Sequence, residues 1–527
     1  MRTAGKIGQT DNFYALLLVI IGGALISLYY FTGLFGSDDL AYINGAAGFA
    51  QAPYYALLGA ARYTISVPLR VMLELSGNEP QKAVFGFVFV FVVLALVVYF
   101  LAARVYNKRE ALLSSILVVA NPVLFFFAGA VLPDNMLSIM FVVAVLLFAY
   151  WYKCMRLGVS SGGWSLFLAS SFAALCYVTK EAALAFFLPV AAYALWTIRG
   201  MPLQAAFRHL GWGIGGVACV LLGDLLLSYG VFGDPLIRFT VAKNMNVVQE
   251  AAKFMSYQGT MPIERLNYAY GQFRALWPVA PIYFASILLL IWRHRSISRF
   301  ICSVDGIVSL SALWVLLFLT FGSISLREYV GIPIQIRYYA PAAVLFCIVL
   351  ARAVSPWLGS SGILRSMAMA ALVGLVAQQI VFPAERAGDI YRAREFRAFQ
   401  AAVSNARERF PGVPVYVDDY FSFRALGYGP QHGVSPAKGN LRQGSRAIIV
   451  YNPSEALKHT NSWPLRCASV EGAGVRDITS EVGPRMARTR MDGVEAELGF
   501  FDWSMTETKP RVFVLMLEPD GTCQSDR

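Results

Sequence analysis

Acidic and basic side chains stand at the ends of long apolar runs, where they could carry chemistry beside a membrane. The pair Asp38-Asp39 follows the first run, and Asp134 stands between two later runs. Lys180 lies in a very short gap between two runs, and Arg337 opens a late one. An ionisable residue at membrane depth costs about 2.5–3.5 kcal/mol on insertion scales. Each of these residues therefore needs a physical reason to be there.

The carboxylates are open to two interpretations. Asp38 and Asp39 could supply a general base or bind a divalent cation, although helical side chains one residue apart diverge by about 100° and only one would face a given substrate. The alternative is a helix start, because acids in the first turn interact favourably with the helix dipole. Asp134 follows Pro133 at a tight turn, and the same two interpretations hold for it.

The cations are also open to two interpretations. Lys180 could bind the phosphate of a lipid carrier, or it could simply neutralise the neighbouring Glu181. Arg337 could grip phosphate through its fork of donors. It could equally be an interface anchor, with Tyr338 as part of an aromatic belt.

The elements that must position these residues are membrane helices. The chain has 527 residues, of which 57% are hydrophobic and only 14% charged, against about 25% charged in soluble domains. A bilayer core needs about 20 helical residues to cross. We predict about eleven transmembrane helices in a domain of residues 1–383, at about 13–35, 83–103, 111–131, 135–152, 164–180, 182–198, 211–231, 276–292, 303–322, 338–354 and 363–383.

Charge distribution predicts the orientation and the partners. Basic residues concentrate in alternate short loops, which places the N-terminus in the cytoplasm and the long loops 36–82 and 232–275 outside. Residues 1–383 hold 25 Lys and Arg against 14 Asp and Glu, whereas residues 384–527 hold 19 against 18. The basic excess therefore belongs to the membrane part, where it suits lipid head groups rather than nucleic acid.

The tail, residues 384–527, predicts a small extracytoplasmic α/β domain. Apolar residues from Phe396 to Phe410 follow helical spacing. Three apolar stretches read as strands, at 413–417, 447–451 and 511–517. Cys467 and Cys523 could form a disulfide in that compartment or remain two separate thiols.

Two other features carry no assigned role. The stretch Gly211-Trp-Gly-Ile-Gly-Gly216 fits a dinucleotide-binding pattern, but no strand precedes it and it lies inside an apolar run. Close packing of membrane helices explains it better. Asp224 lies in the same run and calls for a cation that the sequence does not identify. The four histidines form no cluster, which argues against a histidine-based metal site.

Taken together, the charged clusters resemble the GT-C superfamily, in particular the bacterial branch related to protein O-mannosyltransferases and lipid A aminoarabinose transferases. The matching elements follow the family's order over residues 1–350. They are the acidic pair after the first helix, Arg62 and Pro68 in the first outer loop, Pro133-Asp134, Thr179-Lys180, and Arg337-Tyr338-Tyr339-Ala-Pro341.

The resemblance implies an inverting glycosyltransferase of a bacterial inner or plasma membrane. It would move a sugar from a polyprenyl-phosphate carrier to an envelope glycan, lipid or protein acceptor at the outer face. No cofactor would be required, although Asp38 and Asp39 permit a divalent cation. The resemblance implies three roles: catalytic carboxylates at Asp38 (the general base), Asp39 and Asp134, donor-phosphate contacts at Lys180, Arg337 and Arg62, and acceptor or sugar contacts at Tyr42 and Tyr338.

Two other classes of function stay open. A secondary transporter or flippase of an anionic or lipid-linked substrate would also be polytopic, but transporters usually show internal repeats and charges near the bilayer midplane. Here the charges lie at helix ends, and the long outer loops and the tail favour an enzyme. A polymerase or ligase of lipid-linked glycans is closer, and the sequence does not separate it from a transferase of one sugar.

Overall fold

The fold is seen in a computed structural model, which describes residues 4–29, 38–52, 56–159, 162–244, 258–325, 329–381 and 388–417, and four strands after them. The chain forms two compact units. The first comprises residues 1–31, 45–53 and 57–386, and the second comprises 32–44, 54–56 and 387–527. Cys467 and Cys523, and with them the disulfide considered above, lie outside the described residues.

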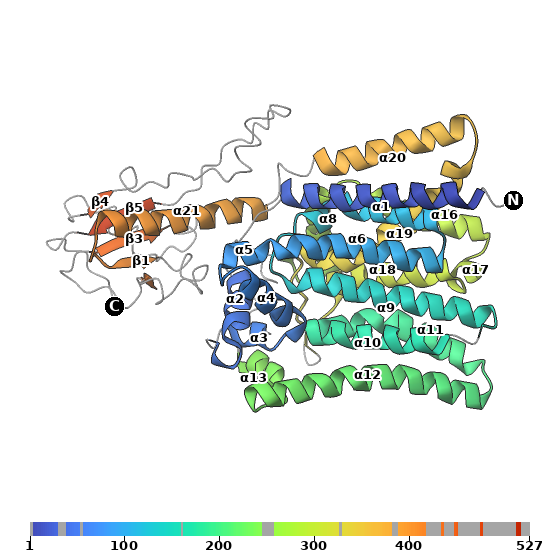
Figure 1. The fold of residues 1–527 in the computed structure, drawn as a ribbon, viewed down its shortest axis with the longest axis horizontal. Coiled ribbons are helices and arrows are strands. Elements are labelled where there is room, and N and C mark those ends of the chain that lie inside the picture. Colours follow the sequence, from blue (N-terminus) through green and yellow to red (C-terminus); the bar gives the residue numbers. More distant parts are fainter. Residues whose placement is uncertain are drawn as a thin grey trace. The chain divides into compact units, whose positions relative to one another are not determined.

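The first unit consists almost entirely of helices, and the long ones lie side by side along a common axis (Figure 1). The long helices follow from the apolar runs, since a helix satisfies its own backbone hydrogen bonds where water is absent. Its helices are α1 (Ala4–Tyr29), η1 (Phe49–Gln51), α3 (Leu57–Ala60), α4 (Tyr63–Leu75), α5 (Pro80–Val84), α6 (Gly86–Val105), α7 (Lys108–Val119), α8 (Pro122–Phe125), α9 (Pro133–Arg156), α10 (Gly163–Thr179), η4 (Glu181–Phe187), α11 (Leu188–Arg199), α12 (Leu203–Phe232), α13 (Ile237–Asn244), α15 (Pro262–Leu276), α16 (Ala280–His294), α17 (Ile297–Ile301), α18 (Val304–Phe321), η5 (Ile336–Tyr339), α19 (Ala340–Gly359) and α20 (Ile363–Val381).

The predicted helical membrane protein is confirmed, but the number of full-length spans is smaller than eleven. Among the described residues, seven helices are long and apolar enough to cross a membrane: 82–105, 133–156, 181–199, 203–232, 304–321, 336–359 and 363–380. Three shorter apolar helices accompany them at 16–28, 163–179 and 280–294. Ten of the predicted runs thus have an apolar helix. Seven of these helices have at least 18 residues, and the other three are shorter.

The remaining predicted span, 111–131, is not one helix. Helix α7 ends at Val119, and the short α8 begins at Pro122. Proline has no backbone N–H and cannot continue a helix in its interior, but it suits a first helical position. The side chain of Asn121 accepts a hydrogen bond from the backbone N–H of Val123 at 3.0 Å. An Asn-Pro pair inside an apolar run therefore starts a new helix.

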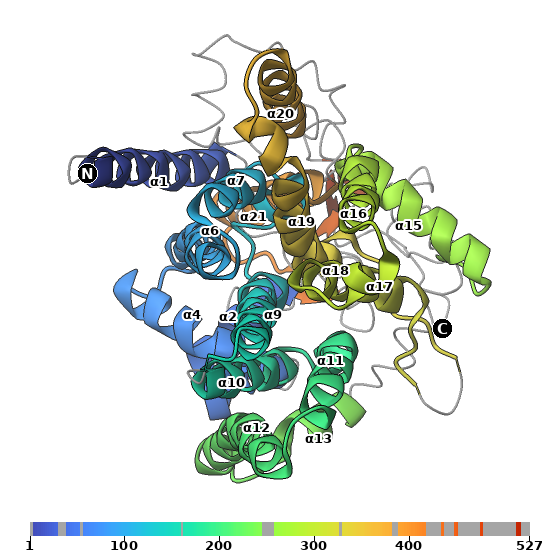
Figure 2. The same cartoon turned by 90° about the vertical axis from the view of Figure 1, so that its right-hand side faces the viewer.

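Burial separates central helices from peripheral ones (Figure 2). The apolar windows of α9 and α19 are 78% and 72% buried, whereas those of α12 and α20 are each 11% buried and are left to face lipid. Helix α12 packs along α10, and a Cβ at Gly216 would collide with the Phe167 carbonyl and the Ser170 hydroxyl of α10. Of the glycines in this stretch, Gly216 fits the packing interpretation, whereas Gly211 and Gly213 have open space where a Cβ would lie.

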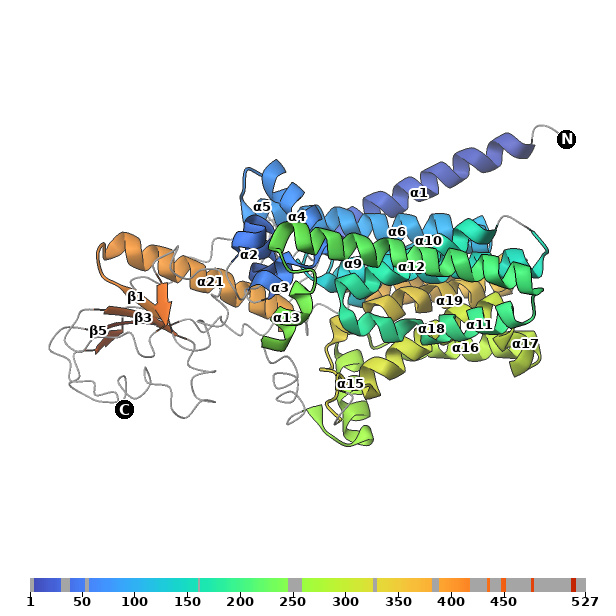
Figure 3. The same ribbon diagram turned by 90° about the horizontal axis from the view of Figure 1, so that it is seen from below.

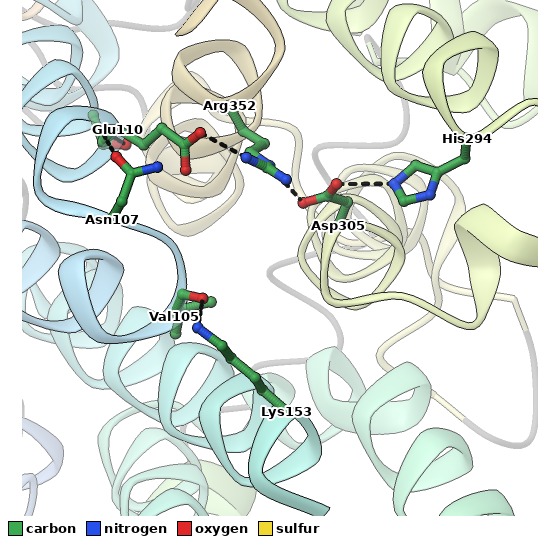
Figure 4. Close-up of polar contacts among 8 residues, drawn as sticks. Val105, Asn107, Glu110, Lys153, His294, Asp305 and Arg352 are labelled. Carbon is green, nitrogen blue, oxygen red and sulfur yellow. Dashed lines mark hydrogen bonds and ion pairs between the residues drawn. The ribbon is translucent and has the colours of Figure 1, made fainter. Parts of the chain in front are cut away.

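One group of ion pairs ties four helices together and is called the four-helix network (Figure 4). It consists of Glu110 on α7, Arg352 on α19, Asp305 on α18 and His294 on α16. Arg352 lies 2.6 Å from the Glu110 carboxylate and 3.2 Å from that of Asp305. His294 Nε2 lies 2.9 Å from Asp305. Both acids occupy the first turns of their helices, which also favours their negative charge.

The second unit contains a five-stranded sheet in the order β2-β1-β3-β5-β4. The central β1 (Val415–Val417) and β3 (Ala447–Tyr451) are parallel, as are β1 and β2 (Val434–Pro436), whereas β5 (Phe513–Leu517) runs antiparallel to β3 and β4 (Val475–Asp477). Helix α21 (Gly388–Arg409) packs on β1 and β3. The predicted α/β character of the tail is confirmed. Strands β2 and β4 were not predicted, since each has three residues that include polar side chains or proline, whereas the equally short β1 is Val-Tyr-Val.

Candidate active site

A buried carboxylate at the start of α9 forms ion pairs with two cations that are far apart in the sequence. Pro133 fills the first helical position of α9, so Asp134 falls in the first turn, with its side chain 2% exposed. Lys180 Nζ donates to Asp134 Oδ1 at 3.0 Å. Arg337 Nε lies 3.7 Å from Asp134 Oδ2. Three residues that the sequence predicted for the site therefore converge in the structure.

Tyr338 lies against both of these cations. The Lys180 ammonium is 3.4 Å from the centroid of the Tyr338 ring, and the Arg337 guanidinium carbon is 5.4 Å from it. An aromatic face attracts cations electrostatically, and more strongly where water is scarce. The ring and the carboxylate of Asp134 thus hold the two cations near each other against their mutual repulsion.

A second line of charges begins at the residue after Lys180. Glu181 Oε2 accepts from Arg62 at 3.1 Å, and its other oxygen lies 4.0 Å from Arg238. Arg238 also contacts Asp224 at 2.5 Å. Lys180 therefore does not serve to neutralise Glu181, because the acid has two arginines of its own.

Arg238 is the residue of this site that the sequence analysis missed. It lies on α13 and is 5% exposed, and it donates to the Val178 carbonyl at 2.7 Å. Asp224, inside a membrane helix, was the available signal, because a buried carboxylate needs a cation. Arg238 in the loop that follows α12 is the nearest arginine after it in the chain.

The tripeptide 179–181 joins the two lines of charge. Helix α10 ends at Thr179, Lys180 is extended, and η4 begins at Glu181. The side chain of Lys180 therefore points to Asp134, whereas that of Glu181 points to Arg62. Thr179 also shares a 2.8 Å hydroxyl contact with Thr64 of α4. The resulting seven-residue cluster has four cations and three carboxylates: Arg62, Lys180, Arg238 and Arg337, with Asp134, Glu181 and Asp224.

The remaining predicted residues lie at the start of α2 (Asp38–Gly48), and residues 32–44 belong to the second unit. Asp38 is exposed, whereas Asp39 is 1% and Tyr42 7% exposed. The two acids thus point to different environments, as expected for consecutive positions on a helix. Their relation to the seven-residue cluster, and the roles assigned to them, stay predictions.

A metal-binding role also stays a prediction. Within the part of the chain that the structure describes, no three or more His, Cys, Asp or Glu side chains gather closely enough to hold a metal ion. Asp38 and Asp39 alone would provide two carboxylates on diverging sides of a helix turn. A cation there would need ligands from its substrate, such as phosphate oxygens.

Comparison with known proteins places this geometry in a family context. The family model described as dolichyl-phosphate-mannose-protein mannosyltransferase matches residues 65–222. This stretch includes α9 and α10 and most of α4 and α12, and with them Asp134, Lys180 and Glu181. No curated protein sequence matches the chain significantly.

Solved structures match over nearly the whole chain. ArnT from Cupriavidus metallidurans bound to undecaprenyl phosphate superposes with a TM-score of 0.52 at 12% identity, covering 97% of this chain and 99% of that one. The same protein in the apo state gives 0.51 at 13% identity, with 97% and 98% covered. At such identities the likeness concerns the fold. The chain is an integral membrane protein with the fold of the GT-C glycosyltransferase superfamily, as the resemblance in its sequence predicted.

Proposed function

We propose that the chain is a glycosyltransferase that moves a sugar from a polyprenyl-phosphate carrier to an acceptor at the outer face of a bacterial inner membrane. The observation that supports this most is the convergence of Lys180 and Arg337 on buried Asp134 beside Tyr338. ArnT, which shares the fold, was solved with undecaprenyl phosphate bound. Such a ligand presents one phosphate at the membrane surface, where paired cations would meet it.

The cations would serve the leaving group. When the bond between the sugar and the phosphate breaks, negative charge grows on the phosphate oxygens. Lys180 and Arg337 are only 19% and 14% exposed, so their charges act with little screening by water. Fixed cations aimed at developing charge are usually the largest single contribution to such a reaction. In this proposal Arg62 and Arg238 extend the same positive field.

Asp134 would position the cations rather than accept a proton. Each of its oxygens faces a cation, and its side chain is almost completely buried. Removing it would leave two like charges without the carboxylate that holds them together. This assigns Asp134 a narrower role than the general orientation of acceptor or base.

Asp38 would be the general base. The acceptor hydroxyl attacks the anomeric carbon as the bond to phosphate breaks, its proton passes to Asp38, and the configuration inverts because attack and departure occur on opposite faces. A positioned carboxylate of this kind typically contributes 10²–10⁴-fold. Tyr42 and Tyr338 would contact the sugar or acceptor. The N-terminus would be cytoplasmic, and the second unit would face the outside.

The test is transfer of a labelled sugar from its polyprenyl-phosphate carrier by the purified protein in liposomes. Asp38→Asn should lose at least 100-fold in turnover while inserting and folding normally. Asp234→Asn is the matched control, since that acid lies between α12 and α13 and, among the described residues, accepts hydrogen bonds from the nearby Leu236 and Thr240. Normal turnover by Asp38→Asn would remove the base from the mechanism.

The products of the same assay distinguish a transferase of one sugar from a polymerase and from a flippase. Addition of one sugar to a glycan, lipid or protein acceptor supports the proposal, whereas a ladder of products would indicate a polymerase. Movement of the intact lipid-linked sugar across the bilayer, with no new bond formed, would indicate a flippase. Chelation by EDTA should leave transfer unchanged if no divalent cation takes part.

A further inference from the structure

The segment that leads to Arg337, residues 329–335, has little secondary structure to hold it, and we call it the approach segment. Within the described residues, its strand-like pairing is confined to residues 322–324: an isolated bridge between Ser323 and Gly331, a hydrogen bond from the Ile324 N–H to the Val330 carbonyl at 2.9 Å, and one from the Ile332 N–H to the Gly322 carbonyl at 3.2 Å. Val330, Ile332 and Ile334 are nevertheless at most 5% exposed. Buried backbone groups need hydrogen-bond partners. The groups that residues 322–324 do not reach, which are the N–H and carbonyl of Ile334 and the carbonyl of Ile332, take theirs from side chains.

Gln258 supplies one pair of these hydrogen bonds. Its side-chain carbonyl accepts from the backbone N–H of Ile334 at 2.7 Å, and its amide donates to the Ile334 carbonyl at 3.2 Å. The side chain is 3% exposed. A side-chain amide therefore pairs with this residue in the way that a neighbouring strand would, three positions before Arg337.

Arg265 supplies the second attachment. Its Nε donates to the Thr320 carbonyl at 2.7 Å, and its Nη2 donates to the Ile332 carbonyl at 2.6 Å. Thr320 lies in the last turn of α18, where carbonyls lack helical partners and the helix dipole is negative. A Cβ at Gly331 would collide with the Arg265 guanidinium, so this glycine permits the close approach.

Arg265 is completely buried, and no carboxylate pairs with it within the described residues. A buried guanidinium held only by backbone carbonyls is a costly arrangement. The long side chain and planar guanidinium of Arg265 hold the backbone of Thr320 and that of Ile332 at a fixed spacing. On the far side of η5, the Tyr339 hydroxyl contacts the Thr320 hydroxyl at 3.1 Å.

Both attachments come from residues 258–276, most of which form α15. This helix lies crosswise to the long helices of its unit (Figures 2 and 3). Ile263, Leu266 and Tyr270 are 62%, 48% and 61% exposed on one side of it, while Arg265, Ala269 and Phe273 are buried on the other. An amphipathic helix of this kind can lie in the membrane interface, where its position would anchor both attachments.

We infer that Gln258 and Arg265 are positioning residues that fix the register of the approach segment and so hold Arg337 and Tyr338 against Asp134 and Lys180. The inference rests on the proposed function, since it concerns the donor-phosphate cations. Loss of either attachment lets η5 shift by fractions of a residue. Arg337 then meets the donor phosphate less often, while the rest of the unit stays folded.

The experiment measures kcat, the KM for the polyprenyl-phosphate sugar and the KM for the acceptor, together with the Kd for undecaprenyl phosphate alone. Gln258→Ala should raise the donor KM and the carrier Kd about tenfold and leave the acceptor KM within twofold. Arg265→Lys keeps the charge but loses the fork, so it should show the same donor-specific defect. Gln258→Glu keeps the acceptor for Ile334 and should recover part of the loss.

Gln379→Ala is the matched control. Gln379 is also buried, and it accepts two hydrogen bonds, from Trp277 and Tyr283, without contacting the approach segment. It should lower the unfolding midpoint as much as Gln258→Ala does but leave the donor KM unchanged. Equal effects of the two variants on every constant would overturn the inference and leave the proposed function intact. A wild-type protein that neither binds the carrier nor transfers sugar would remove both.

Discussion

The first unit holds two groups of buried charge, and they are built differently. The four-helix network pairs two acids in first helical turns with Arg352 and His294. The seven-residue cluster sets Lys180 and Arg337 against one carboxylate and over one ring. Arg337 and Arg352 are fifteen residues apart along the same chain direction, or roughly 22 Å at 1.5 Å per helical residue. The groups are therefore independent.

The difference indicates what each group is for. In the four-helix network, every polar contact crosses from one helix to another, which suits a structural tie between α7, α16, α18 and α19. In the seven-residue cluster, cations outnumber carboxylates, and two of them are held close together. Crowding like charges costs free energy and is seldom useful to stability alone. We expect the first group to affect folding and the second to affect transfer.

The largest effect should come from Lys180→Ala, which removes a cation from the leaving group. We expect kcat/KM for the lipid-linked donor to fall about 10²–10³-fold, as for loss of one preorganised electrostatic contact. Lys153→Ala is the matched control, because Lys153 donates to the Val105 carbonyl at 2.7 Å near the other end of α9 (Figure 4). Transfer assays in liposomes measure both.

The outcome for the acceptor decides whether Lys180 binds phosphate. The donor KM should rise more than the acceptor KM, because in the proposed complex the Lys180 ammonium binds the phosphate of the donor and not the acceptor. Equal losses for the two substrates would contradict a phosphate role. A similar defect in Lys153→Ala would mean that the two ends of the bundle are not independent.

Arg352→Met should have the largest effect on stability. It leaves the carboxylates of Glu110 and Asp305 buried without their shared cation, and both side chains are at most 6% exposed. Breaking a buried pair in this way costs about 3–5 kcal/mol. Since Arg352 is itself 27% exposed, water can enter, and we expect about 3 kcal/mol.

Unfolding in detergent, followed by loss of helical signal, measures this change, with Arg293→Met as the control at an exposed position. Transfer per folded molecule should stay within twofold of the wild type. If Arg352→Met lost turnover while its stability was unchanged, the structural role assigned to the four-helix network would be wrong.

The sequence predicts the helices and the cluster to different extents. Long apolar runs predict helices because membrane span length and hydropathy are properties of one segment. Lys180 and Arg337 were identifiable because ionisable residues within or directly beside apolar membrane segments are rare. Asp134 was identifiable in the same way, but its place as the common partner of the two cations was not, since which acid meets which cation depends on how α9, α10 and η5 pack. Arg238 and Gln258 lie in the long connection between α12 and α16, in which no periodicity marks a buried residue.

A smaller effect should appear in the double-mutant cycle of Glu110→Gln with Arg352→Gln. Their 2.6 Å contact predicts a coupling energy of about 1 kcal/mol in unfolding, within the usual range for contacting residues. The equivalent cycle of Asp134→Asn with Lys180→Gln should show its coupling in kcat/KM for the donor. If both pairs showed their coupling in unfolding free energy, or both in kcat/KM, the two groups would not differ in role.

The smallest effect should come from Lys82→Ala, which tests the baseline for both groups. Lys82 Nζ lies 2.7 Å from Glu79, but the side chains are 63% and 58% exposed. Exposed pairs contribute between about 0 and 1 kcal/mol, because water screens the charges and the side chains lose entropy. We expect a change in unfolding free energy below about 0.5 kcal/mol and no change in transfer. A change as large as that of Arg352→Met would show that burial, the property on which the comparison rests, does not decide the strength of ion pairs in this protein.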